Sequence, residues 1–361
     1  LMTTDTVGGV WNYSIELCRS LQLHGVQFVL VTMGRKITAN QKKSVDALHH
    51  VQVIETGFVL EWMKDPWKDI DASGQWLLEL ETSIQPDLVH LNGYSFGALR
   101  FKAPTIVVAH SDVYSWFKSV TGEAPSSEWE AYYHRVKNGL EGAGLVIAPT
   151  YTILENIFNT YTGKIKSRVI RNGRNPKQFY SNPKQPYIFS MGRIWDKAKN
   201  IELLSKVAAQ IPYEIRIAGE QEFSDNQYSA FTTTINFLGP LDEAQVAKEL
   251  SSASVFASPA KYEPFGLSVL EAALSGCALV LGNIASLKEL WDDAAVYVDT
   301  DDPKELADLL NHLMKDPGTR SVLSKKAQEK AKEYTSSFMA ENYLDTYTMM
   351  IHAKNQRSEI A

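Results

Sequence analysis

The segment from residue 255 to residue 281 constrains the fold of this chain more than any other. The runs Val255–Ser258 and Cys277–Leu281 are short and apolar, as buried strands are. Between them lie a Pro-Phe-Gly turn and a helical pattern that Gly276 ends. The segment therefore predicts strand, loop, helix and strand, which is the repeating unit of a parallel α/β sheet.

Strand and helix patterns alternate in the same way along the chain. The first half contains the apolar runs Gln27–Thr32, Val51–Ile54, Leu88–His90, Thr105–Ala109, Leu145–Ala148 and Arg168–Ile170. The second half contains Tyr187–Met191, Glu214–Ala218, Ile235–Leu238, Val255–Ala257, Ala278–Leu281 and Ala295–Val298. Intervening helices are expected at Trp11–His24, Asn200–Gln210 and Glu243–Ser251. Two such series predict two Rossmann-like domains with doubly wound parallel sheets.

The polar stretch Arg171–Pro186 separates the two series and is the predicted linker, because it has three prolines and no periodicity. We therefore place one domain at residues 1–175 and another at residues 176–334, and a chain of 361 residues is long enough for two cores. A last amphipathic helix is expected from about Phe338 to Ile351. The opening Leu-Met-Thr-Thr looks like a first strand cut short, so the natural N-terminus is expected upstream.

Composition excludes several classes of protein. The hydrophobic share of 44% and charged share of 22% are ordinary for a soluble globular chain. The net charge of −6 argues against a general nucleic-acid binder, which would need a basic surface. No apolar stretch reaches the length that spans a bilayer. Cys18 and Cys277 are expected to be buried in a reducing compartment, and no Cys/His spacing predicts zinc.

The predicted helix after the Pro-Phe-Gly turn points most directly to a ligand. Its N-terminus presents backbone amides, and such an end favours anions, phosphate above all. These amides belong to Phe265, Gly266, Leu267 and Ser268. Glu263 lies in the loop before that end, and Glu271 lies about one turn into the helix. An anion site beside two carboxylates suits a ligand that is both phosphorylated and rich in hydroxyls, such as a nucleotide sugar.

The pair Glu263 and Glu271, with Phe-Gly-Leu between them, resembles the motif of the retaining glycosyltransferases of family 4, the glycosyl transferases group 1. The resemblance covers nearly the whole chain; it is strongest from Ile188 to Leu310 and weakest from Gln41 to Gln85. It implies the GT-B fold, in which two Rossmann-like domains with parallel sheets face each other across a cleft. It also implies an N-terminal acceptor domain, completed by a last helix at about 335–361, and a C-terminal donor domain.

Arg193 and Lys199 follow the first strand of the second series. Ligands of open α/β sheets bind beyond the carboxyl ends of strands, so two cations there suit a diphosphate. Taken alone, however, these cations are more typical of a solvated charged loop. The resemblance implies that they contact the diphosphate of the donor, with Lys197 as the alternative to Lys199. Asn200 is predicted to cap the helix that follows.

The resemblance also assigns roles to the two glutamates. It implies that Glu263 contacts sugar hydroxyls near the reacting carbon and that Glu271 accepts hydrogen bonds from the ribose hydroxyls. A carboxylate suits the second role because it can accept from both neighbouring O–H groups.

Further candidates lie at other strand ends. Gly8 and Gly9 come between a strand remnant and a helix, where glycine lets the backbone approach a ligand closely, and they match the N-terminal glycine loop of the family. His110 ends a strand and matches a histidine that faces the donor sugar; His90, at another strand end, ranks below it. Leu241 follows a strand and is expected to contact the nucleobase through its backbone.

The acidic run from Asp299 to Glu305 suggests a metal site, but a simpler explanation accounts for it. Asp302 precedes Pro303 and an acidic first turn, which is the pattern of a capped helix start. We therefore predict no metal.

Together these residues and the resemblance imply a retaining, metal-independent glycosyltransferase. It would move a hexosyl unit, glucose first, from a nucleoside-diphosphate sugar to a saccharide or lipid-linked saccharide acceptor in surface polysaccharide synthesis. UDP-glucose is the first donor expected and a GDP sugar the next. The predicted catalytic residues are Glu263, His110, Arg193 and Lys199. The predicted donor-binding residues are Gly8, Gly9, Leu241, Phe265, Gly266, Leu267, Ser268 and Glu271.

No cofactor, nucleic acid or obligate protein partner is expected for this enzyme. The expected location is cytoplasmic, with peripheral contact at the inner face of the membrane left open. Two other functions remain open: a UDP-sugar epimerase of the same fold, and a nucleotide-sugar binder without catalysis. Acceptor, linkage and oligomeric state are also left open.

Overall fold

A computed structural model of the chain describes residues 1–220 and 235–360. The chain divides into two compact units, which are treated separately. Unit 1 comprises Leu1–Lys118, Gly122–Asn172 and Ser336–Ala361. Unit 2 comprises Ser119–Thr121 and Gly173–Thr335.

The described residues of unit 1 form a seven-stranded sheet in the order β3-β2-β1-β4-β5-β6-β7, in which every neighbouring pair is parallel. Its strands are β1 (Met2–Asp5), β2 (Phe28–Met33), β3 (Val51–Glu55), β4 (Val89–Leu91), β5 (Thr105–Val108), β6 (Leu145–Ala148) and β7 (Ser167–Val169). The central strands β1, β4, β5 and β6 are buried at every position, as expected for a sheet covered on both faces.

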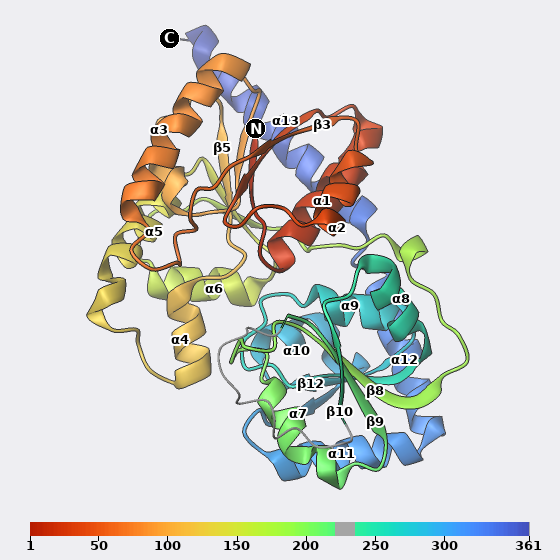
Figure 1. The fold of residues 1–361 in the computed structure, drawn as a ribbon. Helices are drawn as coiled ribbons and strands as arrows, with labels where there is room; N and C mark the ends of the chain where they lie inside the picture. The colour runs from red at the N-terminus through yellow and green to blue at the C-terminus, as the bar shows by residue number, and fades with distance from the viewer. Residues whose placement is uncertain (221–234, 361) are drawn as a thin grey trace. The chain divides into compact units, whose positions relative to one another are not determined.

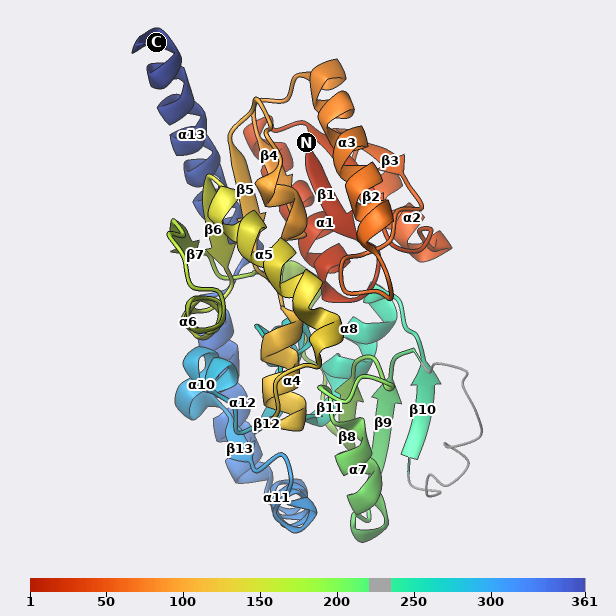
Figure 2. The same cartoon turned by 90° about the vertical axis from the view of Figure 1, so that its left-hand side faces the viewer.

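The helices of unit 1 follow its strands along the chain (Figure 1). They are α1 (Gly9–Leu21), α2 (Ala39–Asp46), α3 (Trp67–Ile84), α4 (Val113–Thr121), α5 (Glu130–Gly142), α6 (Tyr151–Thr160) and α13 (Ser336–Ile360), with short 3₁₀ turns at Gln22–His24, Ser95–Ala98 and Ser127–Trp129. Although α13 comes last in the sequence, it packs beside α1 and the β6–β7 edge of this sheet (Figure 2). Arg168 on β7 donates to Thr346 Oγ1 at 2.8 Å and to Asn342 Oδ1 at 3.1 Å, which fastens the helix to that edge.

The described residues of unit 2 form a six-stranded parallel sheet in the order β10-β9-β8-β11-β12-β13. Its strands are β8 (Gln185–Met191), β9 (Glu214–Ala218), β10 (Ile235–Gly239), β11 (Ala253–Ser258), β12 (Ala278–Gly282) and β13 (Val296–Val298). Counted from its own first strand, this order is 3-2-1-4-5-6, the Rossmann arrangement. The strand order reverses between β8 and β11, so the ligand crevice of such a sheet lies at their carboxyl ends.

Helices cover both faces of the unit 2 sheet. They are α7 (Ile201–Val207), α8 (Glu243–Ser252), α9 (Leu267–Leu274), α10 (Ala285–Trp291), α11 (Pro303–Lys315) and α12 (Pro317–Ala331), with 3₁₀ turns at Pro176–Gln178, Ala208–Gln210 and Asp292–Ala294. Side chains of β11 alternate between the two cores: Phe256 packs with α8, α9, α10 and α12, whereas Val255 and Ala257 pack with α7 and α11. This alternation explains why β11 is buried at every position and why apolar residues adjoin one another at Val255–Ala257.

The predicted fold class, two Rossmann-like α/β domains with parallel sheets, is confirmed. The last helix extends from Ser336 to Ile360, which is longer than the Phe338–Ile351 predicted from periodicity and agrees with the range of about 335–361 that the resemblance implies. One detail was wrong. Asn200 does not cap α7 with its side chain: it has a left-handed backbone (φ 54°), and its amide donates to Pro259 O at 2.9 Å and Thr300 O at 2.8 Å. Because those carbonyls lie on other loops, no local sequence pattern indicated this role.

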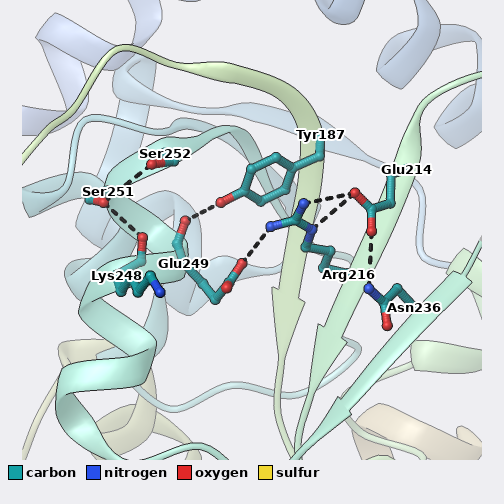
Figure 3. Close-up of polar contacts among 8 residues, drawn as sticks. All are labelled: Tyr187, Glu214, Arg216, Asn236, Lys248, Glu249, Ser251 and Ser252. Carbon is teal, nitrogen blue, oxygen red and sulfur yellow. Dashed lines mark hydrogen bonds and ion pairs between the residues drawn. The ribbon is translucent and has the colours of Figure 1, made fainter.

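A cluster of charged side chains joins α8 to strands β8, β9 and β10 of the unit 2 sheet (Figure 3). The guanidinium of Arg216 lies 3.9 Å from the centre of the Tyr187 ring and pairs with Glu214 and Glu249 at 2.9 Å each. Asn236 donates to the other oxygen of Glu214 at 3.0 Å. Hydrogen bonding from Arg216 lowers the pKa of Glu214. All of these groups are partnered within unit 2, so the cluster joins β8, β9, β10 and α8 and is a structural feature.

Lys184, just before β8, joins the C-terminal ends of two helices. Its Nζ donates to Ser275 O at 2.7 Å, Ser251 O at 2.9 Å and Leu250 O at 3.1 Å. These carbonyls belong to the last turns of α8 and α9, which a helix leaves without internal partners and where a cation is favourable.

Replacing Lys184 with Met should lower the free energy of unfolding by about 1–3 kcal/mol, because half-buried carbonyls lose a charged donor. Lys206→Met is the matched control: Lys206 forms an exposed pair with Glu202 one helical turn away, and its loss should cost at most about 0.5 kcal/mol. Urea unfolding of both variants measures the difference, and equal midpoints would show that Lys184 contributes no more than a surface lysine.

Candidate functional site

The loops that follow β8 and β11 meet at the point where the strand order of unit 2 reverses. The β8 loop carries Arg193 and Lys199, and the β11 loop carries Glu263. The two loops are joined directly, since Lys199 Nζ lies 2.5 Å from Glu263 Oε2 and Lys261 N donates to Ala198 O at 2.8 Å. The structure therefore brings together three of the residues that the sequence singled out.

Local geometry holds this ion pair in place. Gly192 leaves room for the stem of Lys199, because a Cβ on Gly192 would lie 3.2 Å from Lys199 Cγ. Glu263 is buried, and its carbonyl accepts from Ser286 Oγ at 2.6 Å. Lys197, the alternative to Lys199, is exposed. The geometry therefore favours Lys199 as the lysine of the site.

Arg193 is held from two sides. Its Nη2 lies 2.5 Å from Asp196 Oδ2, and its guanidinium lies 5.3 Å from the centre of the Trp195 ring. Burial of Asp196 opposes its ionisation, but the charge and hydrogen bond of Arg193 outweigh that effect, so the pKa of Asp196 is lowered. Arg193 and Lys199 are thus each paired with a carboxylate of the same two loops, Asp196 and Glu263.

The start of α9 lies next to this pair. Gly266 has φ +83°, which glycine adopts without strain, and a Cβ there would lie 3.0 Å from Val269 Cγ2. Its carbonyl accepts from Val269 N and Leu270 N, so α9 begins at Leu267. The amides of 265–268 therefore stand at the first turn of a helix, as the sequence predicts, and helix geometry leaves such donors to a ligand or solvent.

Glu271 lies on α9 with only 4% of its surface exposed, and it has a partner that sequence reasoning missed. Arg174 Nε lies 3.0 Å from Glu271 Oε1, and Arg174 Nη2 lies 3.3 Å from Glu243 Oε1. The Arg174 guanidinium is also 5.4 Å from the centre of the Phe179 ring. The predicted ribose-binding carboxylate is thus oriented by a buried arginine almost a hundred residues away in the sequence.

Leu241, the candidate for nucleobase contact, follows the carboxyl end of β10. Its side chain is partly buried and packs against the core beneath α8 and α9. Its backbone therefore lies at the same edge of the sheet as the β8 and β11 loops.

The candidates of unit 1 also lie at the carboxyl edge of their sheet. Gly8 has φ 80° and ψ −148°, and it immediately precedes α1. A Cβ on Gly9 would meet nothing within 4 Å, so the first turn of α1 has open space beside it. Val7 N donates to Asp5 Oδ1 at 2.6 Å, which fixes the turn that leads into the glycines.

His110 follows β5 and is half-buried. Its Nε2 lies 2.7 Å from Asn92 Oδ1, and its ring meets the Tyr13 ring edge-on at 4.6 Å. Burial lowers the pKa of His110 to about 3. The ring is therefore neutral near neutral pH and can exchange hydrogen bonds but carries no charge.

His90 lies deeper in unit 1. Tyr13 Oη and Tyr347 Oη lie 3.3 Å and 2.7 Å from its two ring nitrogens, and the Tyr343 ring stacks on it at 5.5 Å. Burial, reinforced by the nearby His110, lowers the pKa of His90 to about 3. Only 1% of the residue is exposed, so His90 belongs to the core.

The acidic run of unit 2 is a helix start, as predicted. Asp302 accepts from Glu305 N at 2.9 Å, Asp299 accepts from Asp301 N, and Asp301 pairs with Lys261. Within residues 1–220 and 235–360, no group of three or more His, Cys, Asp or Glu side chains is placed to hold a metal ion. Over the same residues, no helix combines the length and the apolar character needed to cross a membrane.

Two parallel-sheet units with charged loops at a strand-order reversal define the class of α/β proteins with the GT-B fold. The family model "Glycosyltransferase Family 4" matches residues 7–178, and the model "Glycosyl transferases group 1" matches residues 172–330. The two matches together span nearly all of the chain, which therefore belongs to the group 1 glycosyltransferases.

Solved structures of this fold resemble the whole chain. A sucrose-phosphate synthase from Thermosynechococcus elongatus has a TM-score of 0.82, with 19% identity over 98% of this chain and 99% of that chain. Anabaena HepE in complex with UDP and glucose has a TM-score of 0.76, with 16% identity over 96% of this chain and 99% of that chain. At these identities the likeness shows the shared fold.

Curated relatives are also glycosyltransferases or glycan synthases by name. Alpha-maltose-1-phosphate synthase of Mycobacterium tuberculosis is 24% identical over 296 residues, 69% of this chain and 74% of that protein. Sulfoquinovosyl transferase SQD2 of Arabidopsis thaliana is 28% identical over 160 residues, 42% of this chain. That match spans 31% of the length of the plant protein.

The buried pair Arg174–Glu271 generates a stability prediction. Arg174→Met leaves a buried carboxylate without its cation and should cost about 3–5 kcal/mol of unfolding free energy. Arg174→Met combined with Glu271→Gln should cost clearly less than the two single changes added together, because the second change removes the unpaired charge. Glu243→Gln, which alters only the more exposed arm of the network, should cost at most about 1 kcal/mol. Additive costs in urea unfolding would contradict a coupled pair.

Proposed function

We propose that this glycosyltransferase is a retaining, metal-independent enzyme that transfers a hexosyl unit from a nucleoside-diphosphate sugar, UDP-glucose first, to a saccharide or lipid-linked saccharide. The observation that carries the proposal is the Lys199–Glu263 pair beside the first turn of α9, at the strand-order reversal of unit 2. Polar groups for a diphosphate and for sugar hydroxyls converge there.

The diphosphate would bind against the first-turn amides of α9, with Arg193 and Lys199 beside it. The amides would contribute to diphosphate binding as much as the two cations, because each cation already has a carboxylate partner. Backbone dipoles at a helix N-terminus favour an anion without adding a mobile charge. These groups would stabilise the charge that builds on the diphosphate as it leaves the sugar.

The remaining groups would orient the donor. Glu263 would accept from sugar hydroxyls with the oxygen that Lys199 does not hold, Glu271 would bind the ribose, and His110 would contact the sugar. Transfer to the same face of the sugar would proceed with a leaving-phosphate oxygen taking the proton of the acceptor hydroxyl, so no carboxylate nucleophile is required. HepE was solved with UDP and glucose, which supports UDP-glucose as the first donor to test.

The setting is proposed by analogy. An O-antigen chain mannosyltransferase of Escherichia coli is 23% identical over 185 residues, which supports a role in surface polysaccharide synthesis. A cytoplasmic location, with peripheral contact at the membrane, belongs to the same proposal.

Arg193→Ala should weaken binding of UDP by about 1–3 kcal/mol, the scale of one charged hydrogen bond. Isothermal titration with UDP measures the change. Arg135→Ala is the matched control, since Arg135 pairs with Asp71 in unit 1 and should leave UDP affinity unchanged. Unchanged affinity in Arg193→Ala would remove that residue from the diphosphate site.

Turnover of nucleotide sugars tests the function as a whole. Released nucleotide should increase on addition of acceptor, the new bond should keep the anomeric configuration of the donor, and EDTA should change the rate little. Glu263→Gln should lower kcat/KM by about 100-fold or more, because the neutral amide weakens the hold on the sugar at the charge-separating step. An epimerised sugar without acceptor, an inverted product or a strict metal requirement would each contradict the proposal.

A further inference from the structure

Asn92 is a polar residue at the carboxyl edge of unit 1 to which the sequence analysis assigned no role. It follows β4, whose neighbours in the sheet are β1 and β5, and the strand order of unit 1 reverses between β1 and β4. His110, the histidine proposed to contact the donor sugar, follows β5. Asn92 therefore lies beside His110 within unit 1, in the position where a Rossmann-like sheet binds ligands.

The orientation of the Asn92 amide is fixed by a backbone carbonyl, which has one possible role. Its Nδ2 donates to Thr3 O at 2.8 Å and also to Ser14 Oγ at 3.3 Å, and its backbone N donates to Thr3 Oγ1 at 3.0 Å. A backbone carbonyl can only accept, so the amide nitrogen must face Thr3. The amide oxygen must then face His110, whose Nε2 lies 2.7 Å away.

This orientation determines where the proton of His110 resides. An amide oxygen can only accept, so Nε2 must carry a hydrogen and donate it. Burial lowers the pKa of His110 to about 3, so the ring holds a single proton near neutral pH. Nδ1 is left with a lone pair, and among the described residues no hydrogen bond to Nδ1 is found.

The neighbouring histidine, His90, has hydrogen-bond partners of a different kind. Both nitrogens of His90 face tyrosine hydroxyls, Tyr13 Oη and Tyr347 Oη, which can donate or accept. Neither hydroxyl by itself selects a tautomer of His90. The carbonyl of Thr3, acting through Asn92, is what selects one for His110.

We propose that Asn92 is a positioning residue that locks His110 in the neutral tautomer with its proton on Nε2, so that Nδ1 can only accept a hydrogen bond, from a hydroxyl of the donor sugar. The inference rests on the proposed function for the identity of the ligand and on unit 1 alone for the tautomer.

This tautomer limits which groups of a ligand His110 can bind. A neutral acceptor offers nothing to a phosphate oxygen and cannot supply a proton to a leaving group, so His110 acts on the sugar and not on the diphosphate. A site built to accept from a hydroxyl discriminates strongly against an analogue without it, because the acceptor is left unpaired. His110 would therefore be a specificity-determining residue for one hydroxyl of the hexose.

The first experiment reads the tautomer without any ligand. The protein is labelled with ¹⁵N-histidine, and the His110 signals are assigned as those lost in His110→Gln. Two-bond proton–nitrogen correlations should show a protonated Nε2 and an unprotonated Nδ1, unchanged from pH 5.5 to pH 8. A proton on Nδ1, or titration in that range, would overturn the proposal.

The second experiment changes the positioning residue. Asn92→Asp has the same shape but favours a doubly protonated ring, which turns Nδ1 into a donor. The tyrosine and histidine that also face this ring, Tyr13 from α1 and His90 from β4, are unchanged. His110 should titrate near neutral pH, and the affinity for UDP-glucose should fall about tenfold or more below that pKa, the scale of a lost hydrogen bond. Asn355→Asp, an exposed change on α13, is the charge-matched control and should alter neither.

The third experiment identifies the partner atom by calorimetric affinity for UDP-glucose and its monodeoxy and monodeoxyfluoro analogues. Fluorine replaces a hydroxyl without being able to donate, so at one position the deoxy and fluoro donors should lose affinity equally, and His110→Ala should abolish that loss. A fluoro donor that binds as well as the hydroxyl would overturn the proposal. A wild-type protein that binds no nucleotide sugar would instead refute the proposed function, and with it the hydroxyl as ligand, while the NMR result still decides the tautomer.

Discussion

The ion pair between Lys199 and Glu263 is the contact on which the geometry of the proposed donor site depends. It joins the loop after β8 to the loop after β11, the two strands between which the order of the unit 2 sheet reverses. Gly192 and Gly266 make the close approach possible, one by leaving room for the lysine and the other by turning the chain into α9. The backbone hydrogen bond from Lys261 N to Ala198 O joins the same two loops, and the ion pair adds a link between their charged side chains.

The charged side chains at the core of the proposed donor site form ion pairs. Arg193 is balanced by Asp196, Lys199 by Glu263, and Glu271 by Arg174. Buried charges are tolerated only when they are paired, and pairing also fixes the directions in which their remaining hydrogen-bonding positions point. For the proposed ligand, specificity would then come from the directions of these hydrogen-bonding groups, and the backbone amides of α9 would supply the preference for an anion. Unit 1 follows the same rule with neutral groups, since Thr3 and Asn92 fix the hydrogen-bonding role of His110.

Sequence patterns were sufficient where structure is local. The strands of both sheets appear as apolar runs because buried parallel strands admit little else, and the helix start at Asp302 appears because capping uses adjacent residues. The start of α9 was predictable for the same reason. Helix α3 was not predicted, and periodicity alone gave a last helix that is too short. The role of Asn200 was predicted wrongly. An asparagine suits both the cap of a helix and hydrogen bonds to carbonyls of distant loops, and local sequence does not distinguish the two.

The sequence by itself determined the fold class, the family and the helix N-terminus with its two glutamates, because each depends on neighbours in the chain. Only the tertiary structure decided which groups those residues face. Arg174 reaches Glu271, Lys199 reaches Glu263 and Thr3 orients Asn92 toward His110, and each contact joins segments that are far apart in the sequence. Hydrogen-bonding role and charge balance are properties of such pairs, and strand order, not spacing in the chain, sets which loops meet.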